Sequence, residues 1–344
     1  MTSPSNCKNI LVLGAGNFGT CLAQHLALRG HRIKLWDINP VVVDGINSKQ
    51  QNPNYLSHIK LSPNIEAVQN ISAHDLQNIH SCVLAVPTQF LRPTLENQLR
   101  GKLQQPLLIC CAAKGIEVKT FKLPLEIIAD VLGKNFADYS TVLSGPSFAT
   151  EVAENIPTAV AVAGYRTDAA RETQELFHTP LFRVYTSEDP IGLEIAGALK
   201  NVIAIASGAC MGLGFQNNSR AAIITRGLAE ITRIGVKMGA DPLTFLGLGG
   251  VGDLFLTCTS EKSRNFSVGF SLGQGQSLKA SLDKAGSVAE GVTTAQAAYK
   301  LTKSIDVSSP IIDEVYHVLF ESKPIQQAVR DLIEREAKSE LTWE

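Results

Sequence analysis

A single lysine, Lys200, stands in the nearly chargeless stretch ALKNVIAIASG, residues 198–208. Lysine is rarely buried without a partner. On a helix, this side chain either reaches out to the surface or lines an internal cleft. In a cleft, loss of hydration lowers the pKa of the ammonium group and suits it to proton transfer. Helical projection places Ser207 on the face of Lys200, and Glu194 and Asn201 together on another face.

A second group of polar residues follows in the stretch GLGGVGDLFLTCTSEKSRNFSVG. Ser263, Arg264 and Asn265 place a hydroxyl, a forked guanidinium and an amide in consecutive positions, a set that suits the oxygens of a phosphate. Ser263 is equally suited to cap a helix. Asp253, in the same stretch, is expected to pair with Lys200 or to accept hydrogen bonds from substrate hydroxyls.

A glycine fingerprint near the N-terminus points to a bound dinucleotide. Four apolar residues lead into GAGNFG, residues 14–19, and an amphipathic stretch follows. In such a strand–turn–helix unit, Gly14 permits the tight turn, Gly16 lets a diphosphate approach the backbone, and Gly19 lets helix and strand pack closely. The helix N-terminus then offers free N–H groups to the anion.

Two further residues follow strand-like segments and face the same kind of ligand. Asp37 ends the second apolar segment, where an acidic residue accepts hydrogen bonds from a ribose diol and repels a ribose phosphate, so NAD is favoured over NADP. The alternative is a surface aspartate in a turn. Lys114 follows LLICCAAKG, where it either reaches a substrate or cofactor phosphate or is a solvated loop lysine.

The elements that must position these residues change in kind along the chain. The first half alternates strands and helices, which predicts a parallel sheet covered on both faces. After Asp189-Pro190, helices follow one another with no convincing strand. We therefore expect a doubly wound, Rossmann-type α/β domain over residues 1–189 and an all-α domain over residues 190–344. Expected strands are Ile10–Leu13, Arg32–Trp36, Ser81–Val86, Leu107–Cys111, Thr141–Leu143, Ala159–Ala163 and Phe182–Tyr185. Expected helices include Phe18–Arg29, Thr167–Phe177, Ile191–Ala209, Arg220–Met238, a stretch near Arg264, Thr293–Lys303, Ile311–Leu319 and Ile325–Lys338. Expected loops are Asn52–Pro63 and the Gly-rich, mobile stretch Gly269–Ser277.

Composition limits the classes of protein to consider. The chain has 344 residues, 44% hydrophobic and 18% charged, with a net charge of −1, which disfavours a nucleic-acid-binding protein. Seven scattered cysteines are typical of reduced thiols rather than a disulfide framework. The seven histidines show no metal-ligand spacing with Cys or carboxylates. Met1–Asn6 lacks the apolar core of a signal peptide, and no apolar run reaches the roughly 18–20 residues of a membrane span. A cytoplasmic protein without a metal is expected.

The motifs together resemble the NAD(P)-dependent glycerol-3-phosphate dehydrogenases of bacterial type. The matching stretches run in order from about residue 10 to residue 320, and the central and C-terminal ones are more specific than the glycine fingerprint. They are GAGNFGT, AVPTQFLR, AAKGIE, SGPSFATEVA, PTAVAVA, FRVYTSEDPIGLEIAGALKNVIAIASG, NSRAAIITRGLAEITR, GLGGVGDLFLTCTSEKSRN and EGVTT.

The resemblance implies a role for each matching residue. Lys200 is implied as the proton acceptor for the secondary hydroxyl of sn-glycerol 3-phosphate, and NAD or NADP as the cofactor. Implied substrate contacts are Lys114, Gly145, Ser147, Lys200, Asp253, Ser263, Arg264 and Asn265. Implied cofactor contacts are Gly14, Gly16, Asn17, Phe18, Gly19, Asp37, Lys114, Ala149, Arg264, Val288 and Glu290. The resemblance also implies a homodimer and a place at the head of glycerophospholipid synthesis.

Two other functions stay open from the residues. One is a 3-hydroxyacid or ketopantoate-type dehydrogenase, which shares the two-domain plan but has less need of the Ser263–Asn265 cluster because its substrate lacks a phosphate. The other is a sensor that binds NAD without turnover, against which the pairing of Lys200 with Asp253 argues.

Overall fold

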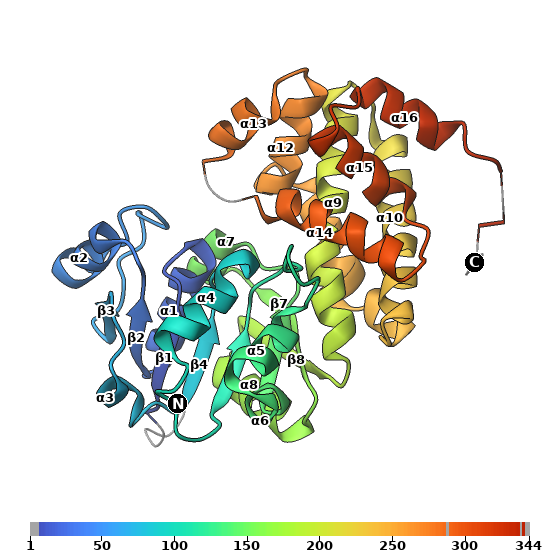
Figure 1. Cartoon of the computed structure of the whole chain (residues 1–344). Helices are drawn as coiled ribbons and strands as arrows, with labels where there is room; N and C mark the ends of the chain where they lie inside the picture. The colour runs from blue at the N-terminus through green and yellow to red at the C-terminus, as the bar shows by residue number, and fades with distance from the viewer. Residues whose placement is uncertain (1–6, 287–288, 338, 341–344) are drawn as a thin grey trace. The chain divides into compact units, whose positions relative to one another are not determined.

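The computed structural model describes residues 7–286, 289–337 and 339–340, which form two compact units. Unit 1 holds residues up to Ala113 and Pro124–Pro190. Unit 2 holds Lys114–Leu123 and the residues from Ile191 onward. Figure 1 shows the strands within unit 1 and a bundle of helices in unit 2. A Rossmann-like sheet followed by a helical region confirms the fold class that the sequence predicts.

Unit 1 is built on one eight-stranded sheet in the order β3-β2-β1-β4-β5-β6-β7-β8. The inner strands β1, β4 and β5 are buried along nearly their whole length, as in a parallel sheet covered on both faces. All neighbouring strands are parallel except β6 and β7. The strands are β1 (Asn9–Leu13), β2 (Arg32–Trp36), β3 (Ile65–Val68), β4 (Ser81–Leu84), β5 (Leu108–Cys111), β6 (Ser140–Ser144), β7 (Thr158–Gly164) and β8 (Phe182–Ser187).

Two features of this sheet differ from the sequence-based prediction. The edge strand β3 was not predicted, because four residues with one exposed side chain give too short an apolar pattern. The antiparallel direction of β7 also differs from an all-parallel sheet. The connection from β6 to β7 contains only α7 (Ala149–Ala153), and five helical residues rise about 7.5 Å, too little to carry the chain back along β6.

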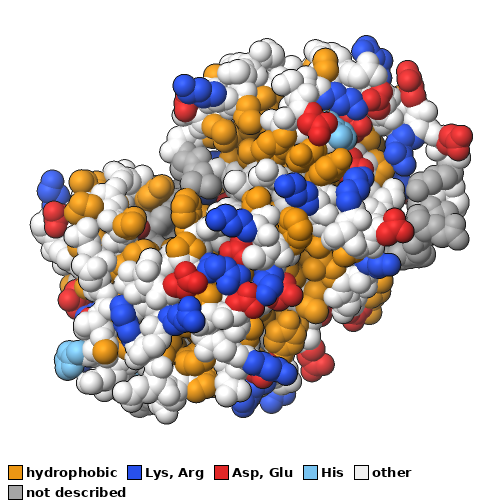
Figure 2. Space-filling model, viewed as in Figure 1, with side chains coloured by type: hydrophobic (Ala, Val, Ile, Leu, Met, Phe, Trp, Pro, Cys, Tyr) orange, Lys and Arg blue, Asp and Glu red, His pale blue; other side chains and the backbone are white. Residues whose placement is uncertain are grey.

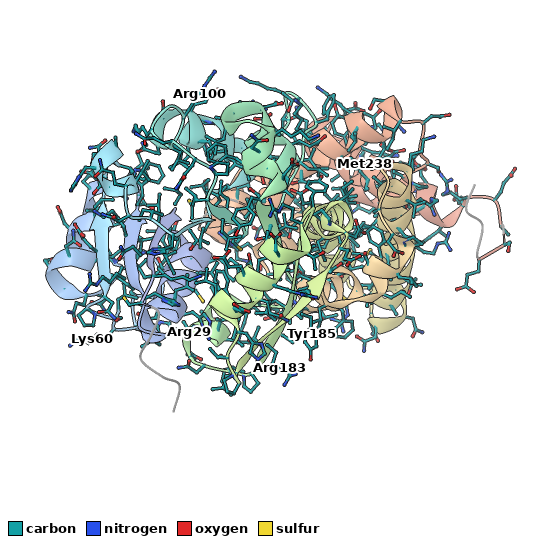
Figure 3. The ribbon with its side chains drawn as sticks, turned by 90° about the horizontal axis from the view of Figure 1, so that it is seen from below. Arg29, Lys60, Arg100, Arg183, Tyr185 and Met238 are labelled. Atoms are coloured by element: carbon teal, nitrogen blue, oxygen red, sulfur yellow. The ribbon has the colours of Figure 1, made fainter. Side chains whose placement is uncertain are left out.

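The helices of unit 1 pack in two groups. Helix α1 (Asn17–Leu28) contacts α7 and α8 (Thr167–Phe177), whereas α5 (Pro124–Leu132) contacts α4 (Thr88–Gln98) and α6 (Lys134–Asp138). At the end of α1, the guanidinium of Arg29 (labelled in Figure 3) donates to the carbonyl oxygens of Glu175 and His178, which closes the last turn of α8. The other two helices in the described part of unit 1 are α2 (Pro40–Lys49) and α3 (Ala73–Leu76).

Unit 2 is helical throughout its described part and is centred on α9 (Pro190–Gly212). By length and composition, this helix is long and apolar enough to span a membrane, whereas the sequence analysis predicts no apolar run of that length. However, 83% of its most apolar window is buried within the protein, as in a core helix. The other elements are α10 (Asn217–Lys237), η1 (Pro242–Leu246), η2 (Leu248–Gly252), α11 (Asp253–Thr259), α12 (Arg264–Gly273), α13 (Leu278–Ala285), α14 (Glu290–Ser304), α15 (Pro310–Phe320) and α16 (Ile325–Ile333).

The Gly-rich stretch 269–277 is not the mobile loop that its composition predicts. Its first half is the end of α12, and Gly269 and Gly273 pack against the backbone of α9. A Cβ on Gly269 would lie 2.0 Å from the carbonyl oxygen of Ile205, and one on Gly208 would lie 2.0 Å from that of Phe266. The glycines therefore serve backbone-to-backbone contact between α9 and α12 rather than flexibility.

One short segment belongs to a different unit from the residues that flank it in the sequence. Lys114–Leu123, which follows β5, belongs to unit 2, and Ile116 and Leu123 are buried in the core of that unit. Lys114 therefore joins the residues that follow β8 in the sequence.

The charge of the surface is mixed. In Figure 2, basic and acidic side chains are interspersed on the face in view, consistent with a net charge of −1 for the whole chain.

Candidate active site

The glycine loop has the geometry that its spacing predicts. Gly14 has a φ of +104°, and its N–H donates to the carbonyl oxygen of Trp36 on β2. A Cβ on Gly19 would lie 1.8 Å from the carbonyl oxygen of Gly14, so only glycine allows α1 to begin here. At Gly16, in contrast, a Cβ would meet nothing within 4 Å. The loop is tight beneath Gly14 and Gly19 and open above Gly16, which leaves room for a ligand at the backbone.

Two polar side chains hold this loop in place. Asp37 accepts hydrogen bonds from the N–H groups of Ala15 (2.8 Å) and Asn39 (2.9 Å). Asn52, fully buried, donates to the carbonyl oxygen of Ala15 (2.9 Å) and to the hydroxyl of Thr20 (2.8 Å). The carboxylate of Asp37 thus lies beside the loop, where it retains lone pairs for a ribose hydroxyl.

The loop fits a dinucleotide. Gly16 precedes α1 as its N-cap and offers no side chain to the first-turn N–H groups, so those of Asn17, Phe18 and Gly19 face outward as anion donors. Asn17 and Phe18 are half-buried at the start of the helix. The groups that would hold the diphosphate of NAD(P) are therefore backbone groups of the loop, and the side chain that would face the ribose is that of Asp37.

The segment after β6 supplies the remaining unit 1 candidates. Gly145 has a φ of +147°, and a Cβ there would lie 2.8 Å from the Cα of Val160. The hydroxyl of Ser147 donates to the carbonyl oxygen of Gly145 (3.0 Å), and Ala149 begins α7. This loop lies at the carboxyl end of β6, separated from β1 by β4 and β5 in the sheet.

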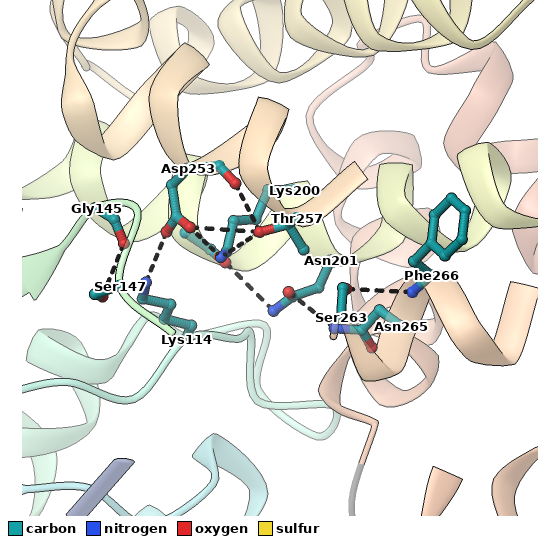
Figure 4. A network of polar contacts seen from close by, with 11 residues as sticks. Lys114, Gly145, Ser147, Lys200, Asn201, Asp253, Thr257, Ser263, Asn265 and Phe266 are labelled. Carbon is teal, nitrogen blue, oxygen red and sulfur yellow. Dashed lines mark hydrogen bonds and ion pairs between the residues drawn. The ribbon is translucent and has the colours of Figure 1, made fainter. Parts of the chain in front are cut away.

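In unit 2, three charged side chains meet in a buried cluster (Figure 4). The ammonium group of Lys200 on α9 donates to one carboxylate oxygen of Asp253 (2.5 Å) and to the hydroxyl of Thr257 (2.8 Å). The ammonium group of Lys114 donates to the other carboxylate oxygen of Asp253 (2.7 Å). Asp253 and Thr257 are one turn apart on α11 and therefore share a face. The predicted pairing of Asp253 with Lys200 is confirmed, and Lys200 lies inside the protein.

Burial and charge set the protonation of this cluster. Burial lowers the pKa of Lys200 to about 8; Asp253 opposes this shift, and the positive charge of Lys114 adds to it. Burial alone would raise the pKa of Asp253, but the charges and hydrogen bonds of Lys114 and Lys200 hold it below its ordinary value. Asp253 therefore stays ionised near neutral pH, while Lys200 is close to its titration point and can give or take a proton.

Beside Lys200, an amide network links three helices. The amide nitrogen of Asn265 on α12 donates to the amide oxygen of Asn201 on α9 (2.9 Å). The amide oxygen of Asn265 accepts from the N–H of Gly291 on α14 (3.0 Å). Ser263 caps α12 by accepting from the N–H of Phe266 (3.3 Å), so the capping alternative for Ser263 is confirmed. Ser263 retains its O–H and Asn265 its second N–H for a ligand.

The other unit 2 candidates lie at helix starts. Arg264 is exposed at the first position of α12, and Glu290 is half-buried in the first turn of α14. Val288 lies outside the described residues. Among the described residues, no group of three or more His, Cys, Asp or Glu side chains is placed to hold a metal ion.

Three residues of these clusters have no role in the sequence-based prediction: Thr257, Asn201 and Asn52. Thr257 had a usable signal, since it follows Asp253 at helical spacing. Asn201 had a weaker one, being next to Lys200. Asn52 had none, because nothing in a polar loop distinguishes the one asparagine that turns inward beneath Ala15.

Comparison with known proteins decides the family. The chain matches the family models for the NAD-dependent glycerol-3-phosphate dehydrogenase N-terminus over residues 9–170 and for its C-terminus over residues 189–330. The chain belongs to the NAD-dependent glycerol-3-phosphate dehydrogenase family. The resemblance drawn from its motifs is thereby confirmed.

Individual glycerol-3-phosphate dehydrogenases are similar over nearly the whole chain. The Staphylococcus aureus glycerol-3-phosphate dehydrogenase [NAD(P)+] is 44% identical over 331 residues, which cover 96% of this chain and 99% of that protein. The crystal structure of the Coxiella burnetii enzyme is 34% identical, with a TM-score of 0.89, covering 96% of this chain and 99% of the other. The structure from Saccharomyces cerevisiae is 28% identical, with a TM-score of 0.80, covering 96% and 100%.

Proposed function

We propose that this protein interconverts sn-glycerol 3-phosphate and dihydroxyacetone phosphate with NAD(P)⁺ and NAD(P)H. The observation that carries the proposal is the buried cluster of Lys200, Asp253 and Lys114 in a member of this family. When bound, the nicotinamide supplies or accepts the hydride. The protein must orient the substrate and move one proton.

Lys200 is the group that moves the proton. In the reducing direction, its ammonium group donates to the oxygen of the substrate carbonyl as that oxygen becomes a hydroxyl. In the oxidising direction, the neutral amine takes the proton back. A pKa of about 8 permits both directions near neutral pH. Asp253 and Thr257 accept hydrogen bonds from the ammonium group and so fix where its proton points.

The start of α12 is suited to the substrate phosphate. Helix α12 has ten residues, and its first-turn N–H groups carry the positive end of the helix dipole. Arg264, at that end, adds a forked guanidinium, while the remaining hydrogens of Ser263 and Asn265 add neutral donors. Because Asn265 is bonded to Asn201, a phosphate held here is held at a fixed distance from Lys200, which gives the orientational part of catalysis. Lys114 adds a second cation beside Asp253, and Gly145 and Ser147 are proposed as further substrate contacts.

The glycine loop is proposed to bind the dinucleotide diphosphate, and Asp37 to favour NAD. The carboxylate repels a 2′-phosphate, so NADP is accepted less readily. Ala149, Arg264, Glu290 and Lys114 are proposed as further cofactor contacts, together with Val288.

The wider setting follows from the same proposal. We propose that residues 1–189 bind the cofactor and residues 190–344 carry the catalytic lysine, with Lys114 joining the latter group. The proposed product, glycerol 3-phosphate, serves glycerophospholipid synthesis in the cytoplasm. A homodimer is proposed as the working assembly.

The decisive experiment follows the near-ultraviolet absorbance of NADH, and separately of NADPH, after addition of dihydroxyacetone phosphate. We expect loss of absorbance with both and a faster loss with NADH. Turnover of a 3-hydroxyacid or of ketopantoate, but not of dihydroxyacetone phosphate, would favour the phosphate-free dehydrogenase instead. Tight NADH binding, without oxidation of NADH by any of these substrates, would favour a sensor that binds NAD without turnover.

A further inference from the structure

A cavity of about 270 Å³ lies along α12, between it, the loop that precedes it, and α13. Arg264, Ser267 and Ser271 line it from α12. They stand three and four residues apart in succession, so they lie on one face of the helix. The cavity therefore runs along the helix from its N-terminus for about two turns, or about 10 Å.

The charged residues that line the cavity are mostly basic. Lys262, Arg264 and Lys284 carry three positive charges, and Glu261 carries one negative charge. Lys284 comes from the last turn of α13, so the cations belong to separate segments that face a common space. A hollow bordered in this way favours an anion.

One side chain that lines the cavity has a hydroxyl without a hydrogen-bond partner in the described part of the chain. Ser271 is 2% exposed and lines the cavity, and its hydroxyl has no hydrogen-bond partner among the described residues. Two other serine hydroxyls that line the cavity already donate hydrogen bonds. That of Ser267 donates to the carbonyl oxygen of Glu261 (3.1 Å), and that of Ser281 donates to the carbonyl oxygen of Ser277 (2.9 Å). Buried polar groups are normally satisfied, so the Ser271 hydroxyl points to a ligand that accepts a hydrogen bond.

We propose that the α12–α13 cavity is a second anion site, which binds a phosphate monoester group between Lys284, Arg264 and the hydroxyl of Ser271. This site is distinct from the proposed substrate site at the start of α12. The substrate site uses the side of α12 on which Asn265 reaches Asn201 on α9, whereas the cavity faces α13. The two sites share Arg264 alone.

Sharing one guanidinium gives the second site a regulatory effect, which rests on the proposed function. A phosphate group held in the cavity draws Arg264 away from the substrate phosphate. Occupancy should therefore raise the KM for dihydroxyacetone phosphate and, because Arg264 is also a proposed cofactor contact, the KM for NADH. It should leave kcat unchanged, because Lys200 and Asp253 are not touched.

Equilibrium binding of inorganic phosphate to the full chain, measured by calorimetry, tests the site without turnover. The variant is Lys284→Gln, and the matched control is Lys279→Gln, an exposed lysine of the same helix that does not line the cavity. We expect phosphate binding about fivefold to tenfold weaker in Lys284→Gln and unchanged in Lys279→Gln, since a charge-assisted hydrogen bond is lost in only one. Equal binding in the two variants would overturn the proposal.

Ser271→Ala tests the hydroxyl that lines the cavity. It removes the hydroxyl and adds no volume, so the fold should be kept and phosphate binding should weaken about threefold. Unchanged binding in this variant would contradict the proposed position of the ligand.

Steady-state kinetics then tests the regulatory effect. In the wild type, added phosphate should raise the KM for dihydroxyacetone phosphate more strongly than in Lys284→Gln, with kcat the same in both. Weakened binding in Lys284→Gln together with an identical rise in KM would overturn the coupling through Arg264. A chain that binds phosphate as expected but turns over no triose phosphate would reject the proposed function and keep the site.

Discussion

The glycine loop of unit 1 and the lysine cluster of unit 2 are built from different groups: the loop from backbone, the cluster from charged side chains. The loop depends on side chains that are absent, because Gly14 and Gly19 leave no room for a Cβ, and its ligand groups belong to the backbone. The cluster depends on side chains that are present, because the charges of Lys200 and Asp253 are buried and that of Lys114 is partly buried. A fault in the loop should therefore change cofactor affinity, and a fault in the cluster should change the rate of proton transfer.

The largest effect is expected from Lys200→Met. This change removes the proposed proton donor and keeps most of the buried volume, while Asp253 stays paired with Lys114. We expect kcat to fall about 10³-fold, within the range for general acid–base catalysis. NADH affinity, followed by fluorescence, should change less than twofold. An unchanged kcat would remove Lys200 from the mechanism, and a parallel loss of NADH binding would break the division of labour between the two regions.

The pH dependence sharpens the same comparison. In the proposed mechanism, reduction of dihydroxyacetone phosphate needs the ammonium form of Lys200. Its rate should therefore fall as the pH rises through about 8, approaching tenfold per pH unit. Oxidation of glycerol 3-phosphate needs the neutral amine, so its rate should rise through the same pH.

Asp253→Asn should move the pH at which both rates change to a lower value. The carboxylate of Asp253 raises the pKa of Lys200 and so opposes the effect of burial, and the variant loses that charge. Profiles of kcat in both directions for the wild type and Asp253→Asn provide the measurement. If the pH dependence of kcat is the same in the variant as in the wild type, a group other than Lys200 controls it.

In the loop, Gly19→Ala and Gly16→Ala form a matched pair. A Cβ at Gly19 would collide with Gly14, whereas one at Gly16 enters open space in the protein alone. We expect both variants to bind NADH about tenfold more weakly, Gly19→Ala because the loop must shift and Gly16→Ala because the methyl group takes the place of the diphosphate. Only Gly19→Ala should also lose thermal stability. Normal NADH binding by Gly16→Ala would show that the diphosphate lies elsewhere.

The smallest effect is expected at Asp37. Asp37→Ser removes the charge that repels a 2′-phosphate and keeps an oxygen that can accept from the N–H of Ala15. We expect the ratio of kcat/KM for NADPH to that for NADH to rise about fivefold, with kcat nearly unchanged. A ratio that does not move would assign cofactor choice to other residues.

The predictability of the two regions from sequence also differs. The loop follows from local spacing, since three glycines between a strand and a helix determine its geometry, and the structure has that geometry. The pairing of Lys200 with Asp253 was one of two alternatives, because the residues are far apart in sequence and only tertiary packing joins them.

Long-range packing also explains what sequence reasoning missed. The composition of residues 269–277 predicts a mobile loop, because composition does not show that α9 lies against the glycines of α12. Asn52 was placed in a loop and its inward turn was missed. The short strand β3 has too few residues to show a pattern of its own.

The placement of Lys114–Leu123 has a consequence for the order in which the protein matures. Chains are synthesised from the N-terminus, and regions tend to fold as they emerge. Ile116 and Leu123 leave the ribosome with the first half of the chain, but the core that buries them consists of helices made later. The sheet can therefore assemble early, while this segment waits as an exposed apolar loop until α9 and its neighbours arrive. Docking of the segment is then the event that brings Lys114 to Asp253, so the cluster cannot form before the helices of unit 2 that bury Ile116 and Leu123 have been made.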